Sequence, residues 1–310
     1  MNIIEIILQS GKTAVDIALY TLLPIMIVML CMMKALEAWG ILAKLVTITG
    51  PLLRPLGLTG LSTFALLQIN FINFAAPLAT LALMDKQGIS DRHMAATLAM
   101  VLAMAQGNVL YPMSPLGLTL APALLISVIG GLSASALTWY VFARPLSAVG
   151  SIVASAQPLQ NQPKQGIVAI ISTSGSEAMK LAAGAVPMLT LTVALFNMLD
   201  AFGAVNAIER FLSPALVFAS IPGVFVRLAL AKYLGGGTAC YSVMVDLIHT
   251  GKLLPSEVNR AAGFLVNSFD LPGIGIFLGI SARFPRIFRY AAPGALAGIL
   301  LRTLIHGFIF

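Results

Sequence analysis

Residues 60–84 read GLSTFALLQINFINFAAPLATLALM, an apolar stretch interrupted at its centre by amide side chains. Gln68, Asn70 and Asn73 lie close together there, shortly before Pro77. Such residues are unfavourable inside a helix that faces lipid. Non-helical backbone within a membrane occurs where protein or a water-filled cavity surrounds it. The stretch therefore predicts a re-entrant helical hairpin with the amide side chains at its tip.

A second stretch, residues 223–247, reads GVFVRLALAKYLGGGTACYSVMVDL and is interrupted at the corresponding place. Here Gly235, Gly236 and Gly237, followed by Thr238, take the place of the amides. Consecutive glycines strongly disfavour a continuous helix. We therefore expect a second re-entrant hairpin with these residues at its tip.

The two stretches belong to an internal repeat with a period of 163 residues. Proline and glycine determine where helices break, so repeated Pro and Gly carry more weight than repeated leucine. The matching pairs are Pro24 with Pro187, Pro51 with Pro214, Gly60 with Gly223, and Gly88 with Gly251. Chance agreement in a glycine-rich chain is the alternative to a duplication. We divide the chain into a first repeat (1–145), a polar linker (146–175) and a second repeat (176–310).

The composition is that of a membrane protein. Of the 310 residues, 59% are hydrophobic and 9% are charged, whereas a soluble domain has about 25% charged residues. The mean hydropathy is +0.96. Asp16–Met33, Leu116–Phe142 and Ala291–Phe310 are apolar runs long enough to cross ~30 Å of hydrocarbon as helices. We predict an all-α, multi-pass integral membrane protein, and the expected location is a bacterial inner membrane.

Each repeat contains the same predicted parts. A long first helix (about 14–38, then 177–201) precedes a shorter Pro-containing helix at the membrane interface (41–56, then 204–219). The re-entrant hairpin follows, and then two further spans. Three transmembrane helices in each half make the repeats inverted relative to one another, as in many secondary transporters. If the hairpins crossed the membrane, each half would have four spans and the repeats would be parallel.

The formal net charge of +7 is better explained by a bias of basic residues towards cytoplasmic loops than by binding to nucleic acid. In the inverted arrangement, the richer side is expected to be cytoplasmic and holds Lys44, Arg54, Lys86, Arg92, Arg144, Lys164, Arg283, Arg286 and Arg289. The other side holds both termini and Lys12, Arg210, Arg227, Lys252 and Arg260.

Short motifs in both halves are similar to those of a known superfamily. Phe74-Ala75-Ala76-Pro77-Leu78 looks like the Thr-Glu-Ala-Pro-Leu at the first hairpin tip of the concentrative nucleoside transporters. Gly107-Asn108-Val109-Leu110 is similar to their next helix, and Phe269–Ile276 (FDLPGIGI) to their Asn-Phe-Ser-Ser-Ile-Gly-Ile. The chain thus resembles the nucleoside-recognition (Gate) superfamily, which also includes ferrous iron permease membrane domains and spore maturation membrane proteins. The resemblance implies a solute site between two hairpin tips.

Most of the family's polar ligand-binding groups are replaced in this chain. Where the nucleoside transporters offer Gln-Thr-Glu to a nucleobase, this sequence has Asn73, Phe74 and Ala75. The ribose-binding Glu of the second hairpin corresponds to about Gly237, and its Asn partner corresponds to Asp270. Because polar groups set the specificity of such a pocket, the resemblance implies the scaffold and leaves the solute open.

Asp270 is the strongest candidate for a functional residue. A carboxylate between apolar runs costs several kcal/mol unless it is paired or hydrated, and the following Leu-Pro-Gly predicts a helix break. It would bind a solute, a cation or a proton; the alternative is a solvated carboxylate near the interface. Lys232 either holds an anion or extends to the interface. The candidate substrate-binding residues are Asp270, Asn73, Asn70, Gln68, Gly236, Gly237, Thr238 and Asn108.

Three functions are compatible with this sequence. The first is a secondary transporter for a small polar solute, nucleoside-like or other. The second is a divalent metal-ion permease on the same scaffold, and the third a non-transporting membrane scaffold or accessory subunit. No catalytic or cofactor-binding motif and no dedicated metal-site spacing is present, so we expect neither an enzyme nor a cofactor. The expected partners are the lipid bilayer and a small-molecule or ion substrate; a homo-oligomer is left open.

Overall fold

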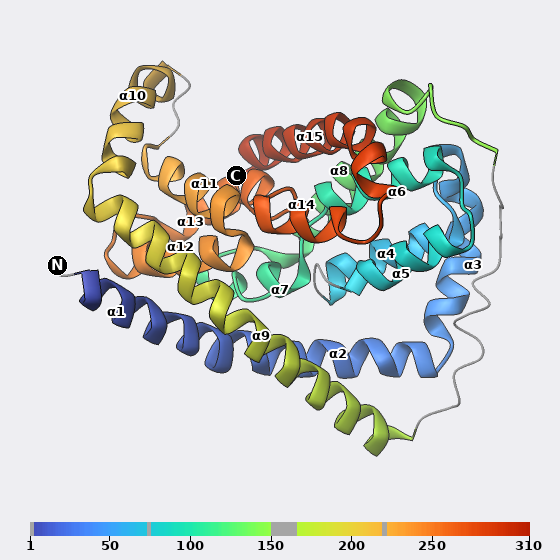
Figure 1. Cartoon of the computed structure of the whole chain (residues 1–310), viewed down its shortest axis with the longest axis horizontal. Helices are drawn as coiled ribbons and strands as arrows, with labels where there is room; N and C mark the ends of the chain where they lie inside the picture. The colour runs from blue at the N-terminus through green and yellow to red at the C-terminus, as the bar shows by residue number, and fades with distance from the viewer. Residues whose placement is uncertain (1–2, 73–75, 150–165, 219–221) are drawn as a thin grey trace.

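The computed structural model describes residues 3–72, 76–149, 166–218 and 222–310, which form helices joined by short connections (Figure 1). In the first half the helices are α1 (Ile3–Asp16), α2 (Leu23–Ala38), α3 (Ile41–Leu53), α4 (Gly60–Phe71), α5 (Ala76–Lys86), α6 (Asp91–Ala103), α7 (Gly107–Leu110) and α8 (Leu120–Leu137). In the second half they are α9 (Ile167–Ala201), α10 (Ala204–Phe218), α11 (Val224–Gly235), α12 (Gly237–His249), α13 (Pro255–Leu265), α14 (Leu271–Leu278) and α15 (Phe284–Ile309).

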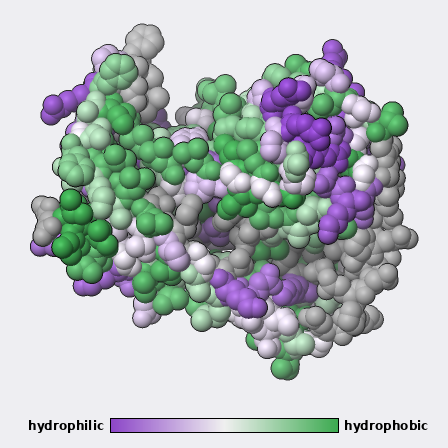
Figure 2. Space-filling model, in the orientation of Figure 1, coloured by the Kyte–Doolittle hydropathy of each residue, from purple (hydrophilic) through white to green (hydrophobic). Residues whose placement is uncertain are grey.

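Several of these helices are long and apolar enough to cross a membrane. Among the described residues they are Ile3–Leu36, Asp91–Leu110, Leu120–Phe142, Ile167–Ala201 and Phe284–Ile309. Figure 2 shows apolar surface over much of the face formed by α1, α9 and α10, and a polar area over the start of α15 and the end of α5. The predicted class, an all-α multi-pass membrane protein, is confirmed.

The helices follow one another in the same order in both halves. A long helical segment comes first (α1–α2, then α9), and a Pro-containing helix follows (α3, then α10). A pair of short helices, a broken helix and a long apolar helix complete each half. This order agrees with the predicted repeat, while its inversion across the membrane remains a prediction.

Each predicted hairpin is a pair of helices that pack against each other, α4 with α5 and α11 with α12. The first hairpin is preceded by a bend of 104°, which lies between Val46–Leu56 and Gly60–Phe71. Thr59 starts α4 in a capping box, since its Oγ1 accepts from the Ser62 amide at 3.3 Å while Ser62 Oγ accepts from the Thr59 amide at 3.0 Å. In the second hairpin, Gly236 has a φ of 87° and separates α11 from α12. Such a left-handed conformation favours glycine.

The long first helices extend further towards the N-terminus than the sequence suggests. The predicted helix 14–38 is α1, a π-helical segment (Ile17–Leu22) and α2, and α9 begins at Ile167 within the predicted linker. Polar residues do not end these helices, because their hydroxyls bond to the backbone one turn earlier. Thr173 Oγ1, for example, donates to the Ala169 carbonyl at 2.8 Å. The remainder of the linker, residues 150–165, lies outside the described residues.

Among the candidate membrane spans, the most enclosed is Asp91–Leu110, which comprises α6 and α7 and is 94% buried inside the protein. It packs against α4, α5, α8 and α15. In contrast, α1 and α2 lie along α9 at the edge of the molecule (Figure 1). The break between α6 and α7 is therefore surrounded by protein rather than by lipid, as irregular backbone in a membrane requires.

Candidate binding site where four helix breaks meet

Four interruptions of helical structure come together in the interior. They lie after α4, between α6 and α7, between α11 and α12, and between α13 and α14. A methyl group added to Gly107 would lie 2.8 Å from the Ile72 carbonyl oxygen, so the end of α4 touches the start of α7. A methyl group added to Gly237 would lie 2.5 Å from Val109 Cγ2, so α12 begins against α7. Both hairpins thus contact α6–α7, the broken helix of the first half.

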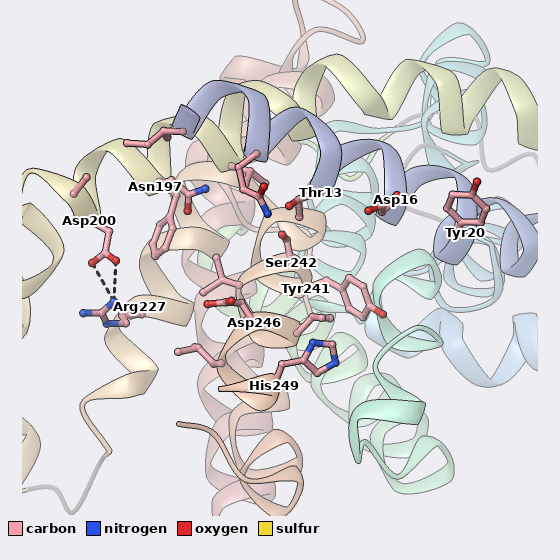
Figure 3. Close-up of a pocket in the computed structure, with 18 residues that line it drawn as sticks. Thr13, Asp16, Tyr20, Asn197, Asp200, Arg227, Tyr241, Ser242, Asp246 and His249 are labelled. Carbon is pink, nitrogen blue, oxygen red and sulfur yellow. Dashed lines mark hydrogen bonds and ion pairs between the residues drawn. The ribbon is translucent and has the colours of Figure 1, made fainter. Parts of the chain in front are cut away.

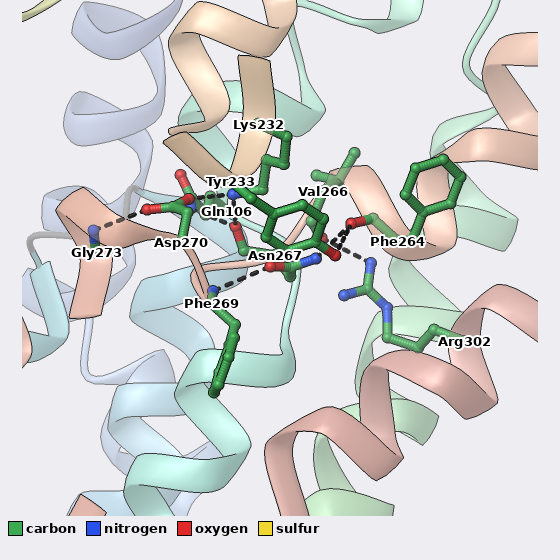
Figure 4. A network of polar contacts seen from close by, with 10 residues as sticks. All are labelled: Gln106, Lys232, Tyr233, Phe264, Val266, Asn267, Phe269, Asp270, Gly273 and Arg302. Carbon is green, nitrogen blue, oxygen red and sulfur yellow. Dashed lines mark hydrogen bonds and ion pairs between the residues drawn. The ribbon is translucent and has the colours of Figure 1, made fainter. Parts of the chain in front are cut away.

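Direct hydrogen bonds join α6–α7 to α13–α14, the broken helix of the second half. The backbone amide of Ser268 donates to the Leu102 carbonyl at 3.0 Å. Gln106 Nε2 donates to the Asn267 carbonyl at 2.5 Å (Figure 4). Asn267 holds its own segment in shape, because its Oδ1 accepts from the Phe269 amide at 3.0 Å and its Nδ2 donates to the Phe264 carbonyl at 2.7 Å. Residues 266–270 are therefore an ordered, irregular segment.

At the centre of this arrangement, Lys232 forms a buried ion pair with Asp270. The two side chains are 0% and 2% exposed. Lys232 Nζ donates to Asp270 Oδ2 and, at 2.8 Å, to the carbonyl oxygen of Asn267 (Figure 4). Lys232 belongs to the last turn of α11, next to the second hairpin tip. It therefore neither extends to the interface nor stands alone as an anion-binding group.

Asp270 is also the N-cap of α14, and its Oδ1 accepts from the Gly273 amide at 2.7 Å. A carboxylate at this position satisfies a free amide of the first turn and interacts favourably with the helix dipole. The predicted helix break at Asp270 is confirmed, and burial rules out the solvated alternative. Gly236 lies beside it, since a methyl group there would be 3.8 Å from Asp270 Oδ1.

Asn70 links the first hairpin to the break after α6. Its Oδ1 accepts from Ser127 Oγ of α8 at 2.7 Å, and that hydroxyl oxygen accepts from the Ala105 amide at 2.7 Å. Its Nδ2 donates to the Leu66 carbonyl at 2.9 Å. Asn70 is 1% exposed, so in this conformation its Oδ1 supports the break segment through Ser127 and its Nδ2 bonds to its own helix.

The other predicted site residues have different positions. Gln68 lies inside the hairpin, where its Oε1 accepts from Thr80 Oγ1 at 2.7 Å and ties α4 to α5. Asn108 is buried in α7, and its Oδ1 is without a hydrogen-bond partner among the described residues. Thr238 lies in the first turn of α12. Asn73 falls outside the described residues. Of the predicted site residues, Asp270, Gly236 and Gly237 thus lie close together. Gln68 instead forms its hydrogen bond within the first hairpin.

Three residues of this region were missed by sequence reasoning: Gln106, Asn267 and Arg302. Gln106 and Asn267 are amides just before or within a helix break, the same signal that singled out Asn70, and they lie two and three residues before the candidates Asn108 and Asp270. Arg302 lies in the uninterrupted helix α15 and is 1% exposed. Its place in the middle of the predicted span Ala291–Phe310 was a signal in the sequence that the list of candidates left out.

A hollow of about 820 Å³ lies between α1, α9 and α12 (Figure 3). Polar side chains line much of it, among them Gln9, Thr13, Asp16, Asn197, Ser242, Asp246 and His249. Its lining includes Tyr241, which is one helical turn from Gly237 at the second hairpin tip. The hollow therefore runs beside the hairpin that carries the tip.

Comparison with known proteins identifies the fold. A structure of CNTnw, a concentrative nucleoside transporter, in an inward-facing substrate-bound state aligns over 96% of this chain and 80% of its own, with a TM-score of 0.67 and 17% identity. A CNTnw variant in an outward-facing state aligns over 98% and 83%, with a TM-score of 0.66 and 17% identity. A variant in an intermediate state covers 92% and 74%, with a TM-score of 0.69 and 18% identity.

No protein-family model matches the sequence, and neither does any curated protein. The chain is therefore a helical membrane protein with the fold of a concentrative nucleoside transporter. Sequence identity of 17–18% shows a shared fold and nothing more. The comparison concerns the path of the backbone, so the polar side chains at the helix breaks are interpreted from their own contacts.

Proposed function

We propose that this protein is a secondary transporter that binds a small polar solute where the four helix breaks meet. The observation that carries the proposal is the buried Lys232–Asp270 ion pair at that point. Removing two charges from water is expensive, and an apolar pair of similar size serves a purely structural core at least as well. Ionisable groups inside membrane proteins usually belong to solute or ion pathways.

The same pair constrains the solute. Lys232 can donate one further hydrogen bond beyond the two that it makes. Among the described residues, Lys232 is the one group that donates to Asp270 Oδ2. A solute that entered between them would have to offer an acceptor to the ammonium and a donor to the carboxylate, because a buried charge left unpaired is strongly unfavourable. Nucleosides and zwitterionic amino acids both meet this requirement.

Access to the site would lead along the hollow between α1, α9 and α12. Its polar lining suits a hydrated solute, and it passes the second hairpin one turn from the tip. CNTnw, which shares the fold, has been solved in inward-facing, outward-facing and intermediate states. A scaffold capable of such states supports alternating access in the present chain.

The proposal is tested by uptake into proteoliposomes. A thermal-shift screen with nucleosides, nucleobases, amino acids and divalent metals first selects ligands, since a ligand well above its dissociation constant stabilises a protein by roughly 2–4 kcal/mol. Uptake of each hit is then compared between the natural protein, Asp270→Asn and the control Glu257→Gln, whose carboxylate caps α13 at the surface. We expect Asp270→Asn alone to lose at least tenfold in uptake.

Three other outcomes would argue against this proposal. Unchanged uptake by Asp270→Asn would remove the ion pair from the mechanism. A shift with divalent metals alone would favour a metal permease, although no cluster of three or more His, Cys, Asp or Glu occurs in the part of the chain that the structure describes. No shift and no uptake with any solute would favour a non-transporting scaffold.

A further inference from the structure

Arg302 is a buried cation whose partners differ from those of every other buried charge. Among the described residues, the buried charged side chains are Lys232, Asp270 and Arg302. Lys232 and Asp270 neutralise each other. Arg302 forms no ion pair with a carboxylate in the described part of the chain. Since an isolated buried charge is strongly unfavourable, something else must stabilise this guanidinium group.

That stabilisation comes from the ends of two broken helices. Arg302 Nη1 donates to the carbonyl oxygen of Ala103, the last residue of α6. Nη2 donates at 2.8 Å to the carbonyl of Val266, the C-cap of α13 (Figure 4). The last carbonyls of a helix have no partner within it and carry the negative end of its dipole. One cation thus serves a helix end from each half of the chain.

The surrounding helices leave room for the arginine to reach this position. A methyl group added to Gly130 of α8 would lie 2.2 Å from Arg302 Cγ and 2.4 Å from Cδ. A methyl group added to Gly263 of α13 would lie 2.5 Å from the Thr303 Cα and 2.7 Å from the Arg302 carbonyl oxygen, so α13 packs directly on the backbone of α15 beside Arg302. At position 130, only a residue without a side chain fits while the Arg302 side chain keeps its path. The arginine is therefore built into the packing of α8, α13 and α15.

We propose that Arg302 is a resident cation that holds the α6 and α13 breaks together and so positions the binding site. Backbone carbonyls at the ends of broken helices are groups that hold inorganic cations such as Na⁺ in other membrane proteins. Here the chain supplies its own charge. Val266 precedes Asn267, whose carbonyl accepts from both Lys232 and Gln106. Arg302 therefore acts on the Lys232–Asp270 pair through the segment that carries it.

Chemical rescue tests the charge directly. In detergent, we expect Arg302→Ala to lower the melting temperature by roughly 5–10 °C, because two buried carbonyls lose a charged donor. Guanidinium chloride at about 10 mM, far below denaturing concentration, should restore at least half of the loss. Urea at the same concentration has nearly the same shape but no charge and should restore none. An equal effect of both compounds, or of neither, would overturn the proposal.

A second pair of variants answers the same question if Arg302→Ala does not fold. Lysine and methionine have stems of similar length and differ in charge. We expect Arg302→Lys to melt higher than Arg302→Met, although a buried lysine is normally the more costly of the two. Equal melting temperatures would show that only the stem matters, and the opposite order would show that a charge is unfavourable there; either result would refute the resident cation. These readouts need no solute, so they are independent of the proposed transport function.

Discussion

Gln106 and Asn267 join the two halves of the chain by one hydrogen bond, from Nε2 of the former to the carbonyl oxygen of the latter at 2.5 Å. Each residue belongs to the break of a different broken helix. The same carbonyl also accepts from Lys232. Because the bond lies at the centre of the proposed site, its strength determines how firmly both breaks are held around the ion pair.

Replacing Gln106 should loosen this junction. We expect Gln106→Leu to destabilise the protein by about 0.5–1.5 kcal/mol, since it removes one of the two donors to the Asn267 carbonyl, which keeps Lys232 as a partner. Thermal melting in detergent measures the effect. Gln9→Leu changes an exposed amide on α1 and should leave the melting temperature within about 1 °C of the natural protein. Equal effects of the two changes would show that the junction contributes little.

The Lys232–Asp270 pair should behave as a coupled unit. Either Lys232→Met or Asp270→Asn alone leaves a buried charge without its partner, which typically costs 3–5 kcal/mol. The asparagine keeps a side-chain oxygen to cap α14. The double variant removes both charges, so we expect its loss of stability to be clearly smaller than the sum of the two single losses. Additive losses in this cycle would mean that the two side chains do not interact.

Much of the fold could be predicted from the sequence because hydrophobic length and helix breakers are local signals. The apolar runs predicted membrane helices, and Gly236 lies at the predicted break of the second hairpin. Asp270 was found for a similar reason: a carboxylate between apolar runs is conspicuous whatever its neighbours are. These residues stand out in the sequence without knowledge of the tertiary structure.

The partners of these residues could not be predicted, because they depend on packing between distant segments. Lys232 and Asp270 are 38 residues apart, and Gln106 and Asn267 are 161 residues apart. Arg302 lies within the predicted span Ala291–Phe310, but its two carbonyl partners belong to segments far away in the sequence. The start of α9 was misplaced because hydroxyl groups lower hydropathy without ending a helix.

The two tip glycines should respond to alanine for different reasons. Gly236 has a φ of 87° and a ψ of 178°, and the nearest atom to an added methyl is 3.6 Å away, so Gly236→Ala meets backbone strain of roughly 1–3 kcal/mol. Gly237→Ala would bring a methyl to 2.5 Å from Val109 Cγ2 and force α7 and α12 apart. The additional variant Val109→Ala should rescue Gly237→Ala but not Gly236→Ala, as measured by thermal melting. Gly184→Ala in α9, with open space around it, is the neutral control.

A polar cluster outside the membrane-spanning helices predicts sensitivity to acid. Arg283 donates to Asp85 Oδ1 at 2.9 Å and to Asp91 Oδ1 at 2.5 Å, which joins the first-half hairpin loop to the segment before α15. Burial raises the pKa of the Asp85 carboxyl, but hydrogen bonds from Ser281 and Arg283 and the charge of Arg283 outweigh it. The pKa of Asp85 therefore lies below its ordinary value of 3.8.

Because the folded-state pKa of Asp85 is lowered, its contribution to stability is complete above the ordinary aspartate range and is lost as the pH falls through the lowered value. We expect the melting temperature to fall by a few degrees between about pH 5 and pH 3. In Asp85→Asn this decrease should be smaller, and the melting temperature at pH 7 should be lower than that of the natural protein. An identical pH profile in the variant would contradict this assignment.

The arrangement of the repeats can be tested with a single pair of equivalent positions. Lys86, at the end of α5, and His249, at the end of α12, occupy corresponding places in the two hairpins, and both are exposed. If each hairpin returns to the side from which it starts, each half crosses the membrane three times, and the two positions lie on opposite sides. If the hairpins cross, the repeats are parallel and both positions lie on the same side.

Labelling of single cysteines decides between these arrangements. Lys86→Cys and His249→Cys are made separately after Cys31 and Cys240 are replaced by alanine, and intact cells are treated with a membrane-impermeant maleimide. We expect His249→Cys to react in intact cells and Lys86→Cys to react only after lysis, because the side with more basic residues faces the cytoplasm. Labelling of both in intact cells, or of neither, would refute inversion. Reaction of Lys86→Cys alone would retain inversion and reverse the orientation.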